Sequence, residues 1–235
     1  MPKIDAKQFI ERVRDRHYLI GKRWKGALLS DLELLRFDLE SADLSGAVLK
    51  GAKLGRVNLA ASNLGGADLS NCKLGGSNLK GANLGGANIT SANLARANLE
   101  AASFGGANMG YVNLEFANLK GANLSGAYLG YAKLSNAILI DSYLWGAFLR
   151  GCNLYRANLE GAYLKGSDLK GADLRGAKLK GADMRGANID RVAIDKRSVM
   201  AFGAAIGIAG RGRSSAMELS RVRHSLLEMG VVISR

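Results

Sequence analysis

The sequence predicts an all-β solenoid, a rod of stacked coils, and two observations carry this prediction. A leucine-like residue recurs at every fifth position from Leu29 to Ile194, giving 34 members, of which 28 are Leu. Two positions before each of them, from Ala42 to Val192, the residue is only Ala, Ser, Cys or Val. An α-helix would scatter such a series around its surface, and a strand would send successive members to opposite faces. A chain that turns a corner in every pentapeptide instead points both series into one narrow interior.

The other three positions of the pentapeptide vary and are expected to face solvent. Asn or Asp dominates the position before the Leu, and Gly dominates two positions after it, as suits tight turns. The runs A-N-L-G-G at 82–86 and A-D-L-R-G at 172–176 resemble the pentapeptide-repeat family, and the resemblance covers about residues 27–195. It implies a right-handed quadrilateral β-helix with four pentapeptides per coil. On that basis the rod has about 8 coils.

Both ends of the rod are predicted to carry short helical caps, because a solenoid exposes unpaired backbone edges at its ends. We expect residues 1–25 to form the N-terminal cap, 26–195 the β-helix, and 196–235 a C-terminal apolar segment and helix cap. Asp5 is placed to begin a helix that runs to about Leu19. The residues on or near its apolar face are Phe9, Ile10, Val13 and His17, and Trp24, in register with the Leu series, is expected to close the core.

The C-terminal cap is predicted from a capping motif and an apolar run. Ser215 and Glu218 form a capping box that begins a helix to about Met229, with Val222 and Leu226 as its apolar stripe. The apolar segment 199–209 is expected to cover the last coil. This segment is much shorter than the roughly 20 residues that a helix needs to span a bilayer.

The sequence offers no chemistry for catalysis. Cys72 and Cys152 occupy the same inward position four coils apart, so they lie roughly 19 Å from each other, beyond disulfide reach. The two histidines, His17 and His224, lie outside the repeats, and no recognised catalytic or nucleotide-binding motif is present. We therefore expect buried thiols, no metal or cofactor, and no enzymatic activity.

The charge distribution bears on the partner. Residues 1–25 and 196–235 each carry a net charge of +5, whereas residues 26–195 carry +3, out of +13 in total. Members of the family that protect DNA gyrase resemble duplex DNA because their rods are strongly acidic, so DNA mimicry is disfavoured for this rod. Binding of nucleic acid by the basic ends is an alternative, but a solvated basic cap is the commoner explanation of such charge.

Folding the repeats into columns, one for each position of the four-pentapeptide coil, gathers outward aromatic side chains on a few neighbouring coils. We call this set the aromatic belt, and Ile138 and Ile140 lie beside it on the fourth face. Clustered exposed aromatics mark protein-binding sites, whereas the alternative is that the rings only stack on one another down the rod. The belt consists of Tyr111, Phe116, Tyr128, Tyr131, Tyr143, Trp145, Phe148, Tyr155 and Tyr163.

A ring of basic residues, the basic collar, surrounds the final coils at one repeated position. It consists of Lys165, Lys170, Arg175, Lys180 and Arg185, with Asp168, Asp173 and Asp183 nearby. The plain explanation of such a ring is local ion pairing on a solvated surface, and the sharper hypothesis is a collar that grips an acidic partner. A strip of Gly pairs at 65–66, 85–86 and 105–106 could admit a flat partner, although corner geometry is the simpler reason for it.

Together these features predict a non-catalytic scaffold or adapter that binds a protein partner, an acidic assembly, through its outward aromatic and basic faces with help from its basic ends. The family is abundant in cyanobacteria, so the most specific version is a basic linker of a phycobilisome or thylakoid complex. One alternative is a regulator associated with a topoisomerase or nucleic acid. Another is a peripheral membrane protein anchored by its C-terminal segment. We expect a cytoplasmic location, or one at the cytoplasmic face of a membrane, with end-to-end or tail-mediated oligomers as a further option.

Overall fold

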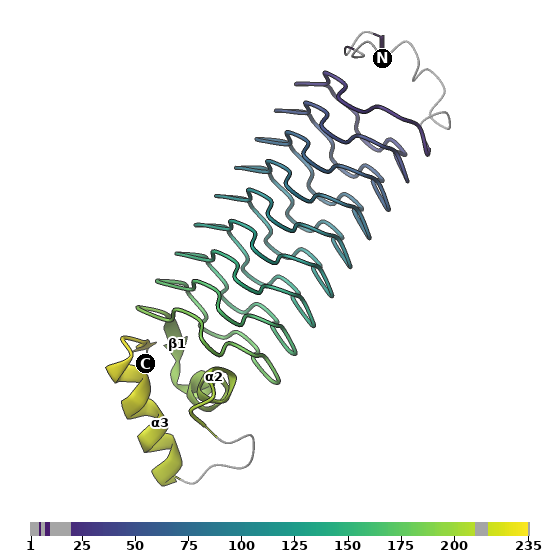
Figure 1. Cartoon of the computed structure of the whole chain (residues 1–235). Helices are drawn as coiled ribbons and strands as arrows, with labels where there is room; N and C mark the ends of the chain where they lie inside the picture. The colour runs from purple at the N-terminus through teal and green to yellow at the C-terminus, as the bar shows by residue number, and fades with distance from the viewer. Residues whose placement is uncertain (1–4, 6–7, 10–19, 210–215, 235) are drawn as a thin grey trace.

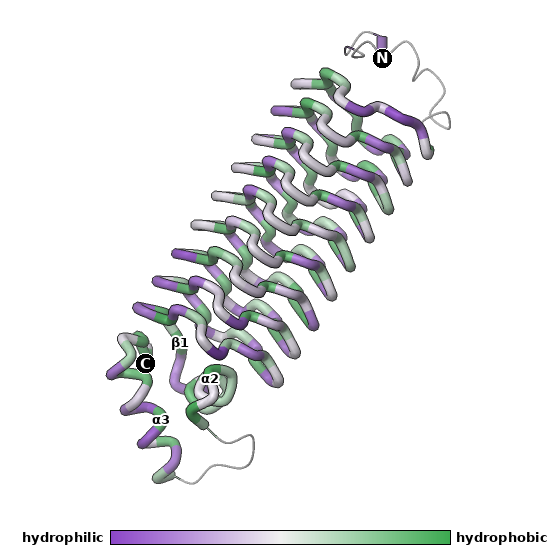
Figure 2. Tube along the Cα trace, viewed as in Figure 1, coloured by the Kyte–Doolittle hydropathy of each residue, from purple (hydrophilic) through white to green (hydrophobic). Residues whose placement is uncertain are grey.

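The computed structural model describes residues 5, 8–9, 20–209 and 216–234. Most of these residues wind into a long rod of stacked coils, and two helices lie at its C-terminal end (Figure 1). The hydropathy of the residues changes in a regular manner along every coil, as expected of a chain that alternates between a buried interior and a solvated exterior (Figure 2).

Successive coils are joined by parallel β-bridges at a constant spacing along the chain. Arg23 pairs with Asp43, and the same spacing recurs at every fifth position as far as the pairing of Asp173 with Ala193. One coil therefore takes four pentapeptides. In addition, the N–H of Leu124 donates to the carbonyl of Tyr143 in the next coil at 2.7 Å. This ladder supplies partners for the backbone groups that the narrow coil would otherwise leave unpaired.

The interior is filled by the two series that the sequence places there. From Leu29 to Met184 no member of the leucine-like series is more than 3% exposed. The small residues are buried as well, and their polar groups have partners: the Ser62 hydroxyl donates to the carbonyl of Leu59 at 2.7 Å. One large and one small side chain per pentapeptide thus fill the interior tightly.

Each pentapeptide turns its corner at the residue two positions after the Leu. Glycine at this position has a positive φ, as at Gly66, Gly86 and Gly106 with φ of +64°, and no neighbouring atom lies where a Cβ would stand. The corner geometry therefore accounts for these glycines. Among the described residues, 16 that are not glycine also adopt positive φ, a conformation that costs about 1 kcal/mol or more for each.

Regular strand is scarce despite the β-ladder, which refines the all-β prediction. Each side of the coil contributes a single bridged residue before the chain turns, so the only named strands among the described residues are β1, Ala193–Asp195, and β2, Val232–Ser234. The predicted number of coils and the three-part division of the chain stay predictions.

At the N-terminal end, the few described residues before the rod begin as the sequence predicts. The Asp5 carboxylate accepts from the Gln8 N–H at 2.9 Å, the geometry of a helix N-cap. Phe9 is fully buried and meets Trp24 edge to face, with ring centroids 4.5 Å apart. Trp24, 3% exposed, thus lies in the core as predicted. The rest of the predicted helix, including Ile10, Val13 and His17, lies outside the described residues.

At the C-terminal end, β1 leads into a 3-10 helix, η2, at Lys196–Ser198, and then into α2 at Val199–Ile206. The predicted contact between this apolar segment and the coils is present: the N–H of Met184 donates to the carbonyl of Ala205 at 2.8 Å, and Phe202 is fully buried.

Helix α3 spans Ala216–Glu228 and buries Val222 and Leu226, the two residues of the predicted stripe. Ser215 of the predicted capping box lies outside the described residues. The sequence analysis missed strand β2, which pairs in parallel with β1 and places Val232 opposite Ala193. Within the described parts of the chain, no helix is long and apolar enough to cross a membrane.

Candidate interaction surface

The aromatic belt lies on the outside of the coils, and four of its nine rings stack in the columns that the repeat predicts. Tyr111 stacks on Tyr131 with centroids 5.5 Å apart and planes 11° from parallel. Tyr143 stacks on Tyr163 at 5.1 Å and 6°, and Trp145 meets both of these rings edge to face. The ladder of stacked rings, offered as the alternative to a binding site, is therefore present.

Stacking leaves the rings substantially open to solvent. Every member of the belt remains at least 36% exposed, and Tyr111 reaches 60%. Ring-on-ring contact thus uses one face of each aromatic and leaves an edge or a second face available. Such an exposed apolar cluster is unusual on a solvated surface and is typical of a protein-binding site.

Three members of the belt occupy corner positions where glycine would be favoured. Tyr111, Phe116 and Tyr131 have φ between 57° and 60°. A bulky residue in this conformation carries backbone strain, which these three share with the other non-glycine corner residues of the rod. Phe116 also lies under the Arg96 guanidinium, whose Cζ is 5.0 Å from the ring centroid.

The basic collar divides into paired and unpaired members. Arg175 binds Asp173, and Arg185 binds Asp183, each through two side-chain hydrogen bonds of 2.6 and 2.8 Å. The hydrogen bonds from Arg185 lower the pKa of Asp183 to about 2, and those from Arg175 lower the pKa of Asp173. Local ion pairing therefore accounts for these collar residues.

The other three collar residues differ in their pairing. Lys170 forms an ion pair with Asp190 in the next coil at 2.6 Å, which lowers the pKa of Asp190. Lys165 and Lys180 form no ion pair with any described residue. These two ammonium groups are the members of the collar without an ion pair among the described residues.

An amide ladder runs down one side of the rod, and the sequence analysis missed it. The side-chain amide of Asn78 donates to that of Asn58 at 3.0 Å, and the amide of Asn98 donates to Asn78 at 3.2 Å. Each of these Oδ1 atoms also accepts the backbone N–H two residues later. Asn before Leu therefore both closes its own turn and ties neighbouring coils together.

The cysteines are structural. Cys72 and Cys152 are free and buried, and their thiols donate to the carbonyls of Leu49 and Leu129 at 2.8 and 2.9 Å. Burial raises the pKa of both thiols to about 12. His224 is exposed on α3, and its Nε2 atom lies 3.1 Å from Oε1 of Glu228. The described residues include no group of three or more His, Cys, Asp or Glu that could hold a metal ion.

The repeats match a family model described as pentapeptide repeats, with eight copies. The matched segments are 25–60, 62–100, 82–115, 97–130, 117–154 and 152–191. The chain belongs to the pentapeptide-repeat family. Proteins of this family form right-handed quadrilateral β-helices, and the spacing of the bridges, four pentapeptides per coil, agrees with that architecture.

Several solved structures of pentapeptide-repeat proteins resemble the chain. HetL, involved in heterocyst differentiation regulation in the cyanobacterium Nostoc sp. strain PCC 7120, is 31% identical over 80% of this chain and 96% of its own, with a TM-score of 0.52. Another Nostoc protein, alr5209, is 28% identical over 52% of this chain and 84% of its own, with a TM-score of 0.39. QnrB1, a plasmid-mediated fluoroquinolone resistance protein, is 20% identical over 90% of this chain and 100% of its own, with a TM-score of 0.42. No curated protein matches the chain.

Proposed function

We propose that this pentapeptide-repeat protein is a non-catalytic scaffold or adapter that binds an acidic protein assembly through the outside of its rod. The observation that carries the proposal is the aromatic belt, whose rings stay exposed although several of them stack. Large aromatic side chains contribute most of the binding energy in many protein interfaces. The net charge of +13 and the unpaired ammonium groups of Lys165 and Lys180 favour an acidic partner.

The most specific form of the proposal is a basic linker of a phycobilisome or thylakoid complex, in the cytoplasm or at the cytoplasmic face of a membrane. Its support is the similarity to HetL, which comes from a cyanobacterium, together with the positive charge. In this proposal α2 and β2 cap the C-terminal end of the rod. The exposed apolar side chains of α3, such as Met217 and Leu227, are where a tail-mediated contact between copies would form.

The structure weighs against a membrane anchor formed by residues 199–209. Val199, Phe202 and Ala205 of α2 are each at most 3% exposed because they pack within the fold. An interfacial helix must present its apolar face to lipid, and this face is already covered. The basic ends leave a nucleic-acid-associated regulator as a second candidate, which a steep salt dependence of DNA binding would reveal.

The test compares the wild-type protein with a variant in which Tyr131, Trp145 and Phe148 are changed to Ser. Purified phycobilisomes are the probe, and binding is followed by co-sedimentation. We expect the wild type to bind and the variant to lose at least tenfold in affinity, since three exposed aromatic contacts are removed. Equal binding by wild type and variant would refute the role of the belt.

A matched control distinguishes the loss of the belt from a general loss of exposed apolar surface. Leu28 and Leu35 lie on the first coils and are 44% and 45% exposed, outside the belt. Changing both to Ser is expected to leave binding unchanged. If the wild type does not bind phycobilisomes at all, the linker version of the proposal is wrong.

A further inference from the structure

The hydrogen-bonded ladder stops short on one face at the C-terminal end of the rod. In the preceding coil of this face, the N–H groups of Leu159 and Gly161 donate to the carbonyls of Lys178 and Lys180 at 2.8 and 2.9 Å. One coil later, the N–H groups of Leu179 and Gly181 have no hydrogen-bond partner among the described residues. The reason is that the chain leaves the coil at η2 and α2 instead of forming another rung.

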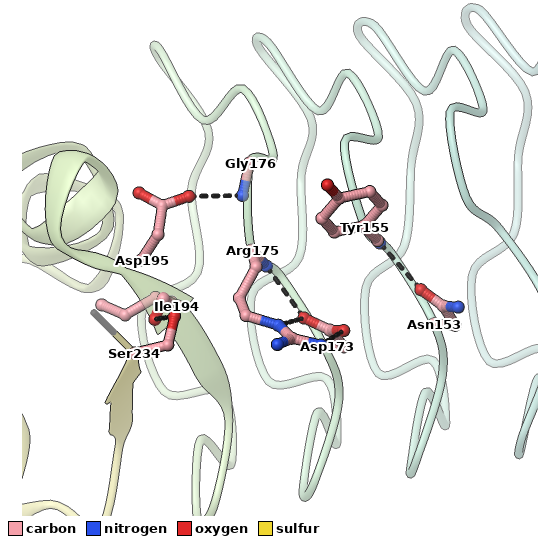
Figure 3. Close-up of polar contacts among 8 residues, drawn as sticks. All are labelled: Asn153, Tyr155, Asp173, Arg175, Gly176, Ile194, Asp195 and Ser234. Carbon is pink, nitrogen blue, oxygen red and sulfur yellow. Dashed lines mark hydrogen bonds and ion pairs between the residues drawn. The ribbon is translucent and has the colours of Figure 1, made fainter.

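A neighbouring position shows what can replace the missing rung. The ladder would pair the N–H of Gly176 with the carbonyl of Asp195, but this N–H donates instead to the Asp195 carboxylate at 2.6 Å (Figure 3). The same carboxylate accepts from the Ser198 N–H at 2.9 Å and from its hydroxyl at 3.0 Å. Desolvation alone would raise the pKa of Asp195, but these hydrogen bonds from Gly176 and Ser198 lower it overall. At this end of the rod a carboxylate therefore already accepts from a backbone N–H group that lacks a carbonyl partner.

The Leu179 end of this unpaired edge borders a hollow of about 770 Å³, and Gly181 lies just beyond the lining residue Lys180. Leu179 lies in its wall, and the nearby cations are Arg156, Arg175, Lys178, Lys180 and Arg197. The acidic residues in the wall are Glu160 and Asp195, and Asp195 is occupied by the hydrogen bonds described above. Because Arg175 is paired with Asp173, the positive charge of the wall comes from Arg156, Lys178, Lys180 and Arg197, which outnumber the acidic residues. A single phosphate ion would fill only a small part of the hollow.

We propose that this hollow binds an acidic segment of another protein in an extended conformation, which adds to the rod as one more rung. The carbonyl groups of the segment accept from the N–H groups of Leu179 and Gly181, and its carboxylates contact Lys178, Lys180 and Arg197. Unpaired strand edges bind extended peptides through such main-chain hydrogen bonds. Complementary charge then selects an acidic sequence.

This site is separate from the part of the aromatic belt tested above. Tyr131, Trp145 and Phe148 do not line the hollow, so their variant is expected to keep it intact. By contrast with the N–H groups of Leu179 and Gly181, the Arg191 N–H of the same coil is paired, because it donates to the carbonyl of Gly230 just before β2 at 3.0 Å. Tyr155 of the belt and Lys180 of the collar do line the hollow, so the variant of Tyr131, Trp145 and Phe148 is the one that tests the belt without altering the hollow.

The experiment uses the full chain and an acetylated heptapeptide in which Asp or Glu alternates with Val. Amide hydrogen exchange is followed by NMR with the peptide at about ten times its Kd. We expect exchange at Leu179 and Gly181 to slow by about tenfold, as follows from the occupancy of the site. Leu159 and Gly161, which are already paired, are expected to exchange at the same rate with and without the peptide.

Paired variants test the charge. The double variant Lys178→Ser with Lys180→Ser is expected to lower the affinity for the peptide about tenfold, in line with the loss of two surface charge contacts. The control, Lys120→Ser with Lys133→Ser, removes the same charge from exposed positions in earlier coils and is expected to leave the affinity unchanged. Unaltered protection of Leu159 in both variants shows that the coils remain folded.

Three outcomes would overturn the proposal. The first is unchanged exchange at Leu179 and Gly181 when the peptide is bound. The second is equal slowing of these amides by inorganic phosphate, which would make the hollow a simple anion site. The third is equal weakening by the control variant, which would reduce the effect to the general charge of the rod.

Discussion

The amide ladder gives a sharp prediction about what holds neighbouring coils together. Asn78 and Asn93 occupy the same position of the pentapeptide, but their hydrogen bonds differ. Asn78 takes part in three: to Asn58, from Asn98 and from the Lys80 N–H. Asn93 has one among the described residues, the N–H of Ala95 at 3.0 Å. The difference in stability between the two Ala variants therefore measures the two hydrogen bonds that Asn78 forms with neighbouring coils.

The magnitude follows from this difference. Each hydrogen bond contributes about 0.5–1.5 kcal/mol net, so Asn78→Ala should lower the free energy of unfolding by about 1–3 kcal/mol more than Asn93→Ala. Urea unfolding followed by circular dichroism provides the assay. With a slope of about 2 kcal/mol per molar urea, the midpoint of Asn78→Ala should lie about 0.5–1.5 M below that of Asn93→Ala.

The control is built into the pair, because both variants lose the bond that closes the turn two residues later. Midpoints that agree within error would mean that the amide ladder contributes nothing to the stacking of coils. The reasoning from hydrogen-bond geometry would then be wrong.

Three further predictions concern the core and the C-terminal edge. Leu124→Ala in the middle of the rod should lower the free energy of unfolding by about 2–5 kcal/mol in the same assay, and a loss well below about 1 kcal/mol would contradict tight packing. Cys152, with its pKa raised to about 12 by burial, should resist a thiol reagent at pH 8 until the protein unfolds, so prompt modification of the folded protein would contradict its burial. The pKa of Asp195 is lowered in the fold, so its carboxylate stabilises the protein above its ordinary pKa and this stabilisation is lost as the pH falls through the lowered value. Asp195→Asn should therefore melt below wild type at pH 7, and the difference in melting temperature should shrink as the pH falls through the lowered pKa of Asp195. A difference that stays constant in acid would exclude this origin.

The interior could be predicted from the sequence because its signal is local and repeated. The series from Leu29 onward and the small residues two positions earlier each have one physical role, which is to fill the same narrow space. The number of pentapeptides per coil is different, since a period of five fixes a corner and not how many corners close a turn. That number came from the family resemblance, and the stacking of Tyr111 on Tyr131 followed from it.

The C-terminal edge could not be predicted because it depends on where the chain leaves the coil. The residues Lys196–Ser198 leave the rod as η2, and this departure unpairs Leu179 and Gly181. Strand β2 is very short and exists because it pairs with β1, which lies far earlier in the chain. No local pattern in either segment signals the pairing. The strained conformation of Phe116 is likewise set by its place at a corner and not by its own preference.

The stacking of four-pentapeptide coils is the central claim, and distances between spin labels test it most directly. In a background with Cys72→Ala and Cys152→Ala, one label is placed at Lys53 and a second at Asn93 or Lys133, in the same column. At about 4.8 Å per coil the backbone separations are roughly 10 and 19 Å. We predict that the distance grows linearly with the number of coils between the labels. Separations that do not increase in proportion to that number would contradict the account.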